Sequence, residues 1–258
     1  MSDKITSLQN PKIKDIISLE TKSRERRARG LFVVEGRREV SRALASGFEP
    51  VEMFFCGEEG EFAGVDCSKY EVSPQVYSKM AYREGTEGIV AVFSARNPRL
   101  EDLKPGDNPL IMVLESVEKP GNLGAALRSA DAAGVDAVLV CDPLTDIYNP
   151  NVIRASLGAV FSVPAVECSS QEAADWLKHN DIRILTAQLQ DSELYYDIDM
   201  KRPTAIVFGT EDKGLTDFWR ERSDARIRIP MAGLMDSLNV SVSAAILCFE
   251  AVRQRSTK

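Results

Sequence analysis

Histidine is almost absent from this sequence, and its few cysteines are not spaced as pairs. The 258 residues contain one histidine, His179, and five cysteines with no C-x-x-C arrangement. Structural zinc sites need clusters of these two residue types, and disulfide-stapled domains carry an even and denser set of cysteines. We therefore expect neither a metal site nor a disulfide framework.

Long apolar runs are also missing. The longest uncharged run, residues 237–249, has 13 residues, against the roughly 20 needed to cross a bilayer. The start, MSDKITSLQNPKIK, lacks the apolar stretch of a secretory signal. With 44% hydrophobic and 28% charged residues, the composition is typical of a globular protein and excludes fibrous or disordered classes. We expect a cytoplasmic protein without a membrane partner.

Charge is distributed unevenly along the chain. The net charge is −7, yet residues 1–42 hold eleven Lys/Arg against six Asp/Glu, a local +5 that leaves −12 for the rest. A basic face on an acidic body suits a polyanion held in one orientation, whereas the plainer interpretation is a solvated helical face. If the partner is RNA, the candidate phosphate contacts in this region are Arg24, Arg26, Arg27, Arg37 and Arg38.

Prolines and a glycine between residues 95 and 109 interrupt every periodic pattern and mark a linker. We expect a small domain over residues 1–95, a linker over 96–108 and a larger domain over 109–258. In the first domain, Asn10-Pro11 predicts the start of a helix that Gly30 ends. The rest of this domain alternates strands (31–36, 51–57, 88–94) with helices (38–47, 74–82), which makes it α/β.

The second half has stronger apolar strands at 110–115, 137–141, 183–187 and 204–209, separated by helical segments near 122–133, 150–158, 170–180 and 214–221. Continuous apolar runs alternating with helices predict an α/β domain with a mostly parallel sheet and helices on both faces. In such sheets the ligand crevice lies at the carboxyl ends of the strands. The residues that follow each strand are therefore the ones to examine for chemistry.

Three segments carry unusual polar residues. Residues 115–134 include Asn122, which either contacts a ligand or caps a helix, and Arg128, which either contacts a ligand or is an ordinary exposed arginine. This segment is not a dinucleotide-binding G-x-G-x-x-G fingerprint. Residues 207–214 form a Gly-x-Glu-x-x-Gly turn after a buried strand. In residues 226–255, Asp236 or Ser237 is the expected N-cap of an apolar helix, and the polar Ser237 and Asn239 need partners or a role.

Taken together, the three segments resemble the ordered motifs of the SpoU/TrmH family of RNA ribose 2′-O-methyltransferases, within the SPOUT superfamily. The matching patterns are N-x-G-A-x-x-R at 122–128, F-G-x-E-x-x-G at 208–214 and I-P-M-x-G-x-x-x-S-L-N-V-S-V at 229–242. Residues 150–164 also resemble the connecting segment of the family. Residues 1–95 resemble the substrate-binding extension, similar to certain ribosomal proteins, that members acting on ribosomal RNA carry.

The resemblance implies S-adenosylmethionine as cofactor, a homodimer and a trefoil knot in the C-terminal domain. By motif position, the residues that border the cofactor are Gly209, Ile229, Met231 and Leu238, with Ala187 after a neighbouring strand. The catalytic or substrate-contacting residues are Asn122, Arg128, Glu211, Ser237 and Asn239. Arg128 either activates the ribose hydroxyl or clamps the adjacent phosphate, and a permanently protonated guanidinium favours the clamp.

The function expected is methylation of a ribose 2′-hydroxyl, with the extension favouring ribosomal RNA over transfer RNA. The alternatives are a transfer-RNA ribose methyltransferase, a non-catalytic RNA-binding or ribosome-assembly protein that keeps the fold, and a nucleotide-dependent oxidoreductase. The missing glycine fingerprint counts against the last one. A chain lacking residues 1–95 is expected to keep cofactor binding and lose RNA affinity. The target nucleotide cannot be predicted, because phosphate contacts carry no sequence information.

Overall fold

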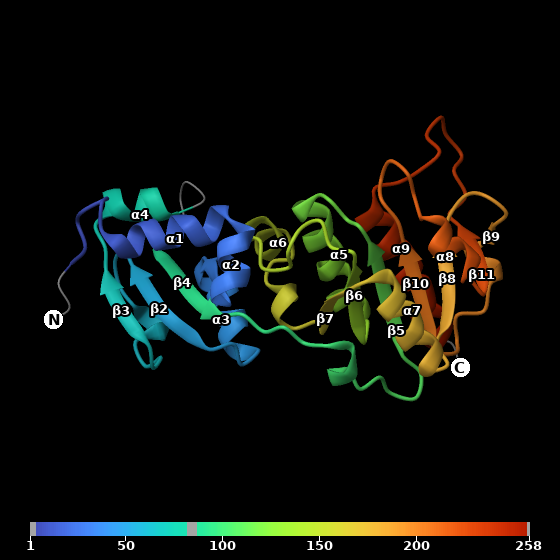
Figure 1. Ribbon diagram of the computed structural model, residues 1–258, viewed down its shortest axis with the longest axis horizontal. Helices are drawn as coiled ribbons and strands as arrows, with labels where there is room; N and C mark the ends of the chain where they lie inside the picture. Colours follow the sequence, from blue (N-terminus) through green and yellow to red (C-terminus); the bar gives the residue numbers. More distant parts are fainter. Residues whose placement is uncertain (1–3, 82–86, 257–258) are drawn as a thin grey trace. The chain divides into compact units, whose positions relative to one another are not determined.

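The computed structural model describes residues 4–81 and 87–256, and the chain forms two compact units (Figure 1). The first comprises Met1–Arg96 and Tyr148–Ser162, and the second comprises Asn97–Ile147 and Val163–Lys258. Among the described residues, no helix is both long enough and apolar enough to cross a membrane.

The first unit is built on a four-stranded sheet in the order β1-β4-β2-β3, antiparallel except for the β2–β3 pair. Its strands are β1 (Leu31–Glu35), β2 (Pro50–Phe55), β3 (Ser68–Glu71) and β4 (Ile89–Ser94). Its helices are α1 (Pro11–Thr21), α2 (Ser23–Arg29), α3 (Arg37–Ala45), α4 (Pro74–Met80) and α6 (Pro150–Ala155), with short 3₁₀ turns η1 (Gly60–Phe62) and η3 (Ala159–Phe161). Tyr82, the last residue of the predicted helix 74–82, lies outside the described residues.

The predicted helix between Asn10 and Gly30 is two helices. The Asn10 side chain accepts a hydrogen bond from the Lys12 amide, as expected of a cap, and Gly30 ends the second helix in the left-handed conformation. The break lies at Lys22, whose backbone is extended (φ −121°, ψ 108°). Ile13 and Ile16 of the first helix are buried, so the helix start and the helix end are confirmed, and the break between them was not predicted.

Residues 148–162 pack in the first unit, although the sequence prediction assigned them to the domain 109–258. The Tyr148 ring stacks on Phe32 with centroids 4.3 Å apart, and Phe161 lies 5.9 Å from the same ring. The Tyr148 hydroxyl donates to the Arg96 carbonyl at 2.7 Å. The physical reason for the difference is this aromatic cluster, because an apolar run reveals burial but not which core it joins.

The second unit has a seven-stranded, fully parallel sheet in the order β7-β6-β5-β10-β8-β11-β9. Its strands are β5 (Leu110–Glu115), β6 (Ala137–Cys141), β7 (Ala165–Cys168), β8 (Arg183–Ala187), β9 (Glu193–Leu194), β10 (Thr204–Phe208) and β11 (Ala225–Arg228). Its helices are α5 (Pro120–Ala133), α7 (Ser170–His179), α8 (Asp217–Glu221) and α9 (Val240–Ser256), with 3₁₀ turns η2 (Leu100–Asp102) and η4 (Tyr195–Asp197). The predicted parallel sheet is confirmed.

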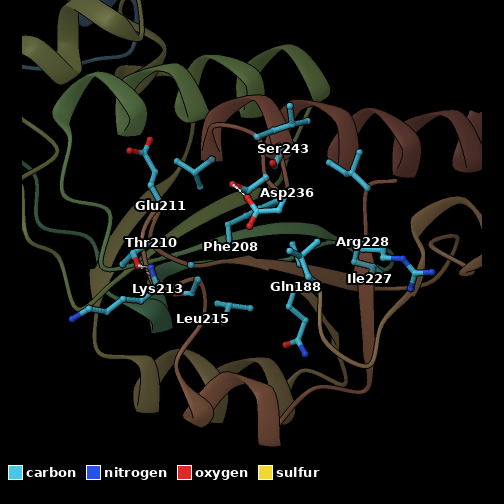
Figure 2. A pocket seen from close by; sticks show the side chains of 18 of the residues that line it. Gln188, Phe208, Thr210, Glu211, Lys213, Leu215, Ile227, Arg228, Asp236 and Ser243 are labelled. Carbon is cyan, nitrogen blue, oxygen red and sulfur yellow. Dashed lines mark hydrogen bonds between the residues drawn. The ribbon is translucent and has the colours of Figure 1, made fainter. Parts of the chain in front are cut away.

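Helices cover both faces of this sheet, as predicted. Helices α5 and α9 pack against each other on one face, and α7 and α8 lie on the other (Figures 1 and 2). Trp219 of α8 is fully buried against the sheet together with Leu177 of α7. On the opposite face, Leu123 and Leu127 of α5 are fully buried. Helices therefore pack against the sheet on both of its faces.

Candidate active site

The carboxyl ends of β8, β10 and β11 surround a cavity of about 330 Å³. The chain segments that line it are the residues after each strand, the loop before α9 and one side of α9 itself (Figure 2). All five predicted cofactor residues line this cavity, namely Ala187, Gly209, Ile229, Met231 and Leu238. Parallel topology explains the convergence, because it brings strand ends that are distant in sequence to one edge.

The turn after β10 forms one wall of the cavity. Thr210 and Gly214 pair through two backbone hydrogen bonds of 3.1 and 3.0 Å, which close the turn. A Cβ atom on Gly209 would overlap the Gly214 and Leu215 backbone, so only glycine fits at the first turn position. The closed turn directs Glu211 away from the sheet and toward α5 (Figure 2).

Three predicted catalytic residues from distant segments meet beside this turn. The Asn239 Nδ2 donates to Asn122 Oδ1 at 3.1 Å and to Glu211 Oε1 at 3.0 Å. The Asn122 side-chain amide also donates to Glu211 Oε1, and Lys119 donates to Glu211 Oε2. The carboxylate is thus anchored by two neutral amides and one cation.

Asn239 also starts helix α9. Its Oδ1 accepts from the Ser241 amide at 2.9 Å and from the Ser241 hydroxyl at 2.6 Å. The prediction that Asp236 or Ser237 caps this helix is therefore wrong, because the chain is still an open loop there. Ser237 is exposed, donates only to Asp236 among the described residues, and lines the cavity.

A second cavity of about 590 Å³ lies on the other side of the same turn and shares residues 209–215 with the first. Its lining includes the carboxyl end of β5 and the start of α5. Glu115, only 3% exposed, accepts from the Thr216 amide at 3.0 Å and the Thr216 hydroxyl at 2.6 Å. This buried carboxylate therefore ties the segment that follows the turn to the carboxyl end of β5.

Arg128 lies outside this cluster. It is exposed on α5, six residues after Asn122, which places it about 9 Å further along the helix axis. It is not among the residues lining either cavity, and its side chain has no hydrogen bond or ion pair within the described part of the chain. Its predicted role stays a prediction.

Two of the five arginines predicted to bind RNA have structural partners instead. Arg26 is 4% exposed and donates to the Leu19 and Glu20 carbonyls at the end of α1. The Arg37 guanidinium donates hydrogen bonds to residues 58, 59 and 61 and to the Glu87 carbonyl. Their donors are already used within the protein, so the other three arginines are the stronger candidates, and RNA binding by Arg26 and Arg37 stays a prediction.

The other three predicted RNA contacts are on the surface. Arg24 and Arg27 are exposed on α2. Arg38 is the second residue of α3. It pairs with the nearly buried Glu39 at 2.6 Å, while half of the Arg38 side chain stays exposed. The basic surface is thus smaller than the count of charges indicated, and it is centred on α2 and the start of α3.

The first cavity fits a nucleoside-like cofactor by its own chemistry. Apolar side chains such as Ile229 and Leu238 suit a flat base, and two buried polar atoms lack partners within the described residues: Gln188 Oε1 and Arg220 Nε, both from lining residues. Buried polar groups without partners are rare and indicate an absent hydrogen-bonding group. No cluster of three or more potential metal ligands occurs among the residues described.

Sequence reasoning missed three residues of this region. Lys119, Gln188 and Arg220 belong to none of the quoted motif positions, yet one anchors Glu211 and the other two line the cavity. Lys119 directly precedes the Pro-Gly-Asn start of α5, so its proximity to Asn122 was readable from the sequence. Gln188 directly follows the predicted strand 183–187, so it belongs to the strand-end residues that the sequence marks for examination. Arg220 carried no signal, because it lies in a short helix of ordinary composition.

Comparison with known proteins identifies a family for each of the two parts of the chain, and both families agree with the resemblance found in the sequence. Residues 109–249 match the SpoU rRNA Methylase family, and residues 10–91 match the MRM3-like substrate binding domain. The 23S rRNA (guanosine(2553)-2′-O)-methyltransferase RlmP of Bacillus subtilis is 31% identical over 249 residues, covering 95% of this chain and 97% of that protein.

Solved structures agree over almost the whole chain. A crystal structure of an RNA 2′-O ribose methyltransferase matches with a TM-score of 0.87 at 40% identity, covering 98% of this chain and 99% of that one. An AdoMet-bound rRNA methyltransferase from Sinorhizobium meliloti matches with a TM-score of 0.91 at 30% identity, covering 98% of both chains. By its family match, its relatives and its fold, the chain belongs to the SpoU rRNA methylase family.

Proposed function

We propose that this protein transfers a methyl group from S-adenosylmethionine to a ribose 2′-hydroxyl in ribosomal RNA. The observation that carries the proposal is the meeting of Asn122, Glu211 and Asn239 beside a cavity lined by the motif residues Gly209, Ile229 and Leu238. The relative from Bacillus subtilis methylates 23S rRNA by its name, and the structure from Sinorhizobium meliloti holds AdoMet.

In the proposed arrangement, Ala187, Gly209, Ile229, Met231 and Leu238 border the adenosyl group in the cavity at the ends of β8, β10 and β11. When bound, S-adenosylmethionine supplies a methyl group on a sulfonium, whose sulfur is a good leaving group. The protein then has to align the hydroxyl with that methyl and accept its proton. The carboxylate of Glu211, oriented by two amides, is proposed for this task, and it lines the same cavity as the exposed Ser237.

Arg128 is proposed as a phosphate clamp rather than a base. Its side chain is exposed and lies about 1.7 helical turns along α5 from Asn122, which suits a contact to RNA next to the target ribose. A guanidinium stays protonated at neutral pH and binds phosphate through a fork of donors. On this account Arg128→Ala lowers the rate far more than it lowers cofactor affinity.

We further propose that the protein works as a homodimer in the cytoplasm and carries a trefoil knot in its C-terminal domain. The dimer is supported by apolar side chains that α9 leaves exposed, Val242 and Phe249, seven residues apart on one face. The first unit, with Arg24, Arg27 and Arg38 on its surface, is proposed to hold the RNA through its phosphates. Ribosomal RNA is favoured over transfer RNA because residues 109–249 match the SpoU rRNA Methylase family and the relative from Bacillus subtilis is named for 23S rRNA.

The test is methyl transfer to RNA from cells that lack this protein. Purified protein with labelled S-adenosylmethionine should modify ribosomal RNA and protect one ribose from alkaline cleavage, and transfer RNA should remain unlabelled. Binding of RNA with no methyl transfer to any fraction would contradict the proposal and support a non-catalytic RNA-binding protein.

A further inference from the structure

Lys119 forms an ion pair with Glu211 at the start of α5, where the second cavity opens. The lysine side chain is 71% exposed, whereas the Glu211 side chain is 25% exposed. The hydrogen bond to Glu211 and the charge of that carboxylate raise the pKa of the Lys119 amine, so the lysine stays protonated. The pair therefore brings a mobile cation to the carboxylate at the centre of the cluster.

Both oxygens of Glu211 are occupied in this arrangement. Oε1 accepts from the amides of Asn122 and Asn239, and Oε2 accepts from Lys119. Asn239 is fixed by its own bonds to Ser241, and Asn122 is held in α5. Lys119 is the only one of the three donors with a full charge on a flexible four-carbon stem, so it is the donor that can be exchanged.

Helix stability does not account for this lysine. Lys119 occupies the N-cap position of α5 and makes no capping hydrogen bond with its side chain. A cation at a helix N-terminus opposes the helix dipole, and an exposed ion pair contributes only about 0–1 kcal/mol. A phosphate brought by RNA carries a full negative charge and competes directly with Glu211 for the ammonium group.

We propose that Lys119 is a positioning residue that exchanges Glu211 for the phosphate next to the target ribose when RNA binds. The exchange frees Oε2 of Glu211 to accept the hydrogen bond of the ribose 2′-hydroxyl. On transfer, the O2′–H proton passes to this oxygen as the O2′–CH3 bond forms and the S–CH3 bond breaks. A carboxylate and a sulfonium thus become a carboxylic acid and a thioether, which balances the charges. This inference rests on the proposed methyl transfer.

The test compares Lys119→Met and Lys119→Arg with Lys178→Met, a matched change of an exposed lysine on α7. Lys119→Met should raise the KM for RNA about tenfold and lower the slope of log affinity against log salt by about one, because one phosphate contact is lost. Lys119→Arg should restore most of the KM. The Kd for S-adenosylmethionine and both RNA parameters of Lys178→Met should match those of the wild type.

An unchanged KM and salt slope in Lys119→Met would overturn the inference, even with a lower kcat, because the lysine would then only support the fold of the site. The salt slope is also measured by RNA binding in the absence of cofactor. That measurement decides the role of Lys119 separately from methyl transfer, so an inactive wild-type protein would count against the proposed function alone.

Discussion

Asn239 has two roles that one substitution separates. Its Oδ1 caps α9 through Ser241, and its Nδ2 holds Glu211 and Asn122. In Asn239→Asp the acceptor for Ser241 remains, but the donor is lost and a second carboxylate faces Glu211. We expect kcat for methyl transfer to fall about 100-fold, with a loss of less than about 1 kcal/mol in unfolding free energy.

Single-turnover methyl transfer and urea unfolding measure the two effects of this change. Asn239→Ala is the matched comparison, because it removes the cap as well and should be less stable than the Asp variant by about 1 kcal/mol. A near-wild-type rate in Asn239→Asp would show that the amide donor has no part in the reaction.

Gly209 tests whether the turn after β10 shapes the cofactor cavity. A Cβ atom there would overlap the backbone of Gly214 and Leu215, so Gly209→Ala must displace the turn. We expect S-adenosylmethionine affinity, measured by calorimetry, to fall at least about tenfold, which corresponds to ~1.4 kcal/mol. The control is Gly134→Ala, with φ +63° and open space around it, which should cost about 1 kcal/mol of stability without changing cofactor affinity.

Glu20 makes the stability of the first unit depend on pH. Burial, with a smaller contribution from the charge of Glu35, raises the Glu20 carboxyl pKa from 4.5 to about 8. The folded state therefore binds a proton that the unfolded state releases above its ordinary pKa. The stabilisation is complete below about pH 4.5 and is lost as the pH rises through about 8.

Replacing this carboxyl by a neutral amide removes the effect. Glu20→Gln should be more stable than the wild type by about 2–4 kcal/mol at pH 8, with little difference at pH 4.5. Urea unfolding of both proteins across this range measures it. Parallel pH profiles for the two proteins would show that Glu20 ionises normally in the folded state.

At the scale of single residues, the sequence indicated which residues meet at the candidate active site, but it did not indicate which arginines form hydrogen bonds within the protein. Asn122, Glu211 and Asn239 were recognised through the motif resemblance, and the structure brings them together. The arginine count treated Arg26 and Arg37 as surface charges, whereas carbonyls of the chain itself occupy them. A guanidinium looks the same in a sequence whether it faces a phosphate or a helix end, so only the fold separates the two.

At the scale of elements, helix α9 is anchored at its end by one side chain. Arg255 donates to the carbonyls of Met200, Asn108, Pro109 and Arg202, and burial lowers its pKa. An ammonium group cannot reproduce this planar set of donors. We expect Arg255→Lys to lower the unfolding free energy by about 2 kcal/mol, because several of these carbonyls lose a charged hydrogen-bond donor.

Urea unfolding of Arg255→Lys and Arg253→Lys separates this anchor from a surface ion pair. The Arg253 side chain is 63% exposed where it pairs with Glu250, so its replacement should change stability by less than about 1 kcal/mol. Equal losses for the two variants would mean that the carbonyl contacts of Arg255 do not stabilise the folded state.

The strands that the sequence predicts most clearly are those that are buried along their whole length. Strands β5, β6 and β10 are buried along their whole length, and this produces the continuous apolar runs that the sequence shows. The missed strands β3, β7, β9 and β11 are two to four residues long and carry charges. Pairing with a neighbouring strand defines them, and no periodicity develops over so short a length.

At the scale of the whole molecule, the first unit is not a contiguous stretch of sequence. Its core includes Phe161, which is 6% exposed and contacts Phe48 with centroids 5.2 Å apart and Phe32 at 5.9 Å. A chain lacking residues 1–95 would leave this ring and Tyr148 without their partners. Loss of RNA affinity in that truncation would therefore not identify the RNA-binding surface, and substitutions in the full chain are the better test.

Phe161→Ala tests this division directly. Removing a buried phenylalanine costs about 3–5 kcal/mol. The loss should fall on the unit formed mainly by residues 1–96, although Phe161 lies 65 residues after Arg96 in the sequence. Hydrogen exchange should show faster opening of β1 and β4, while β5 and β10 keep their protection and the affinity for S-adenosylmethionine stays unchanged. Tyr196→Ala, an exposed ring in the second unit, should alter neither. Faster exchange in β5 and β10 alone would place Phe161 in the core of the second unit and would restore the continuous domain that the sequence indicated.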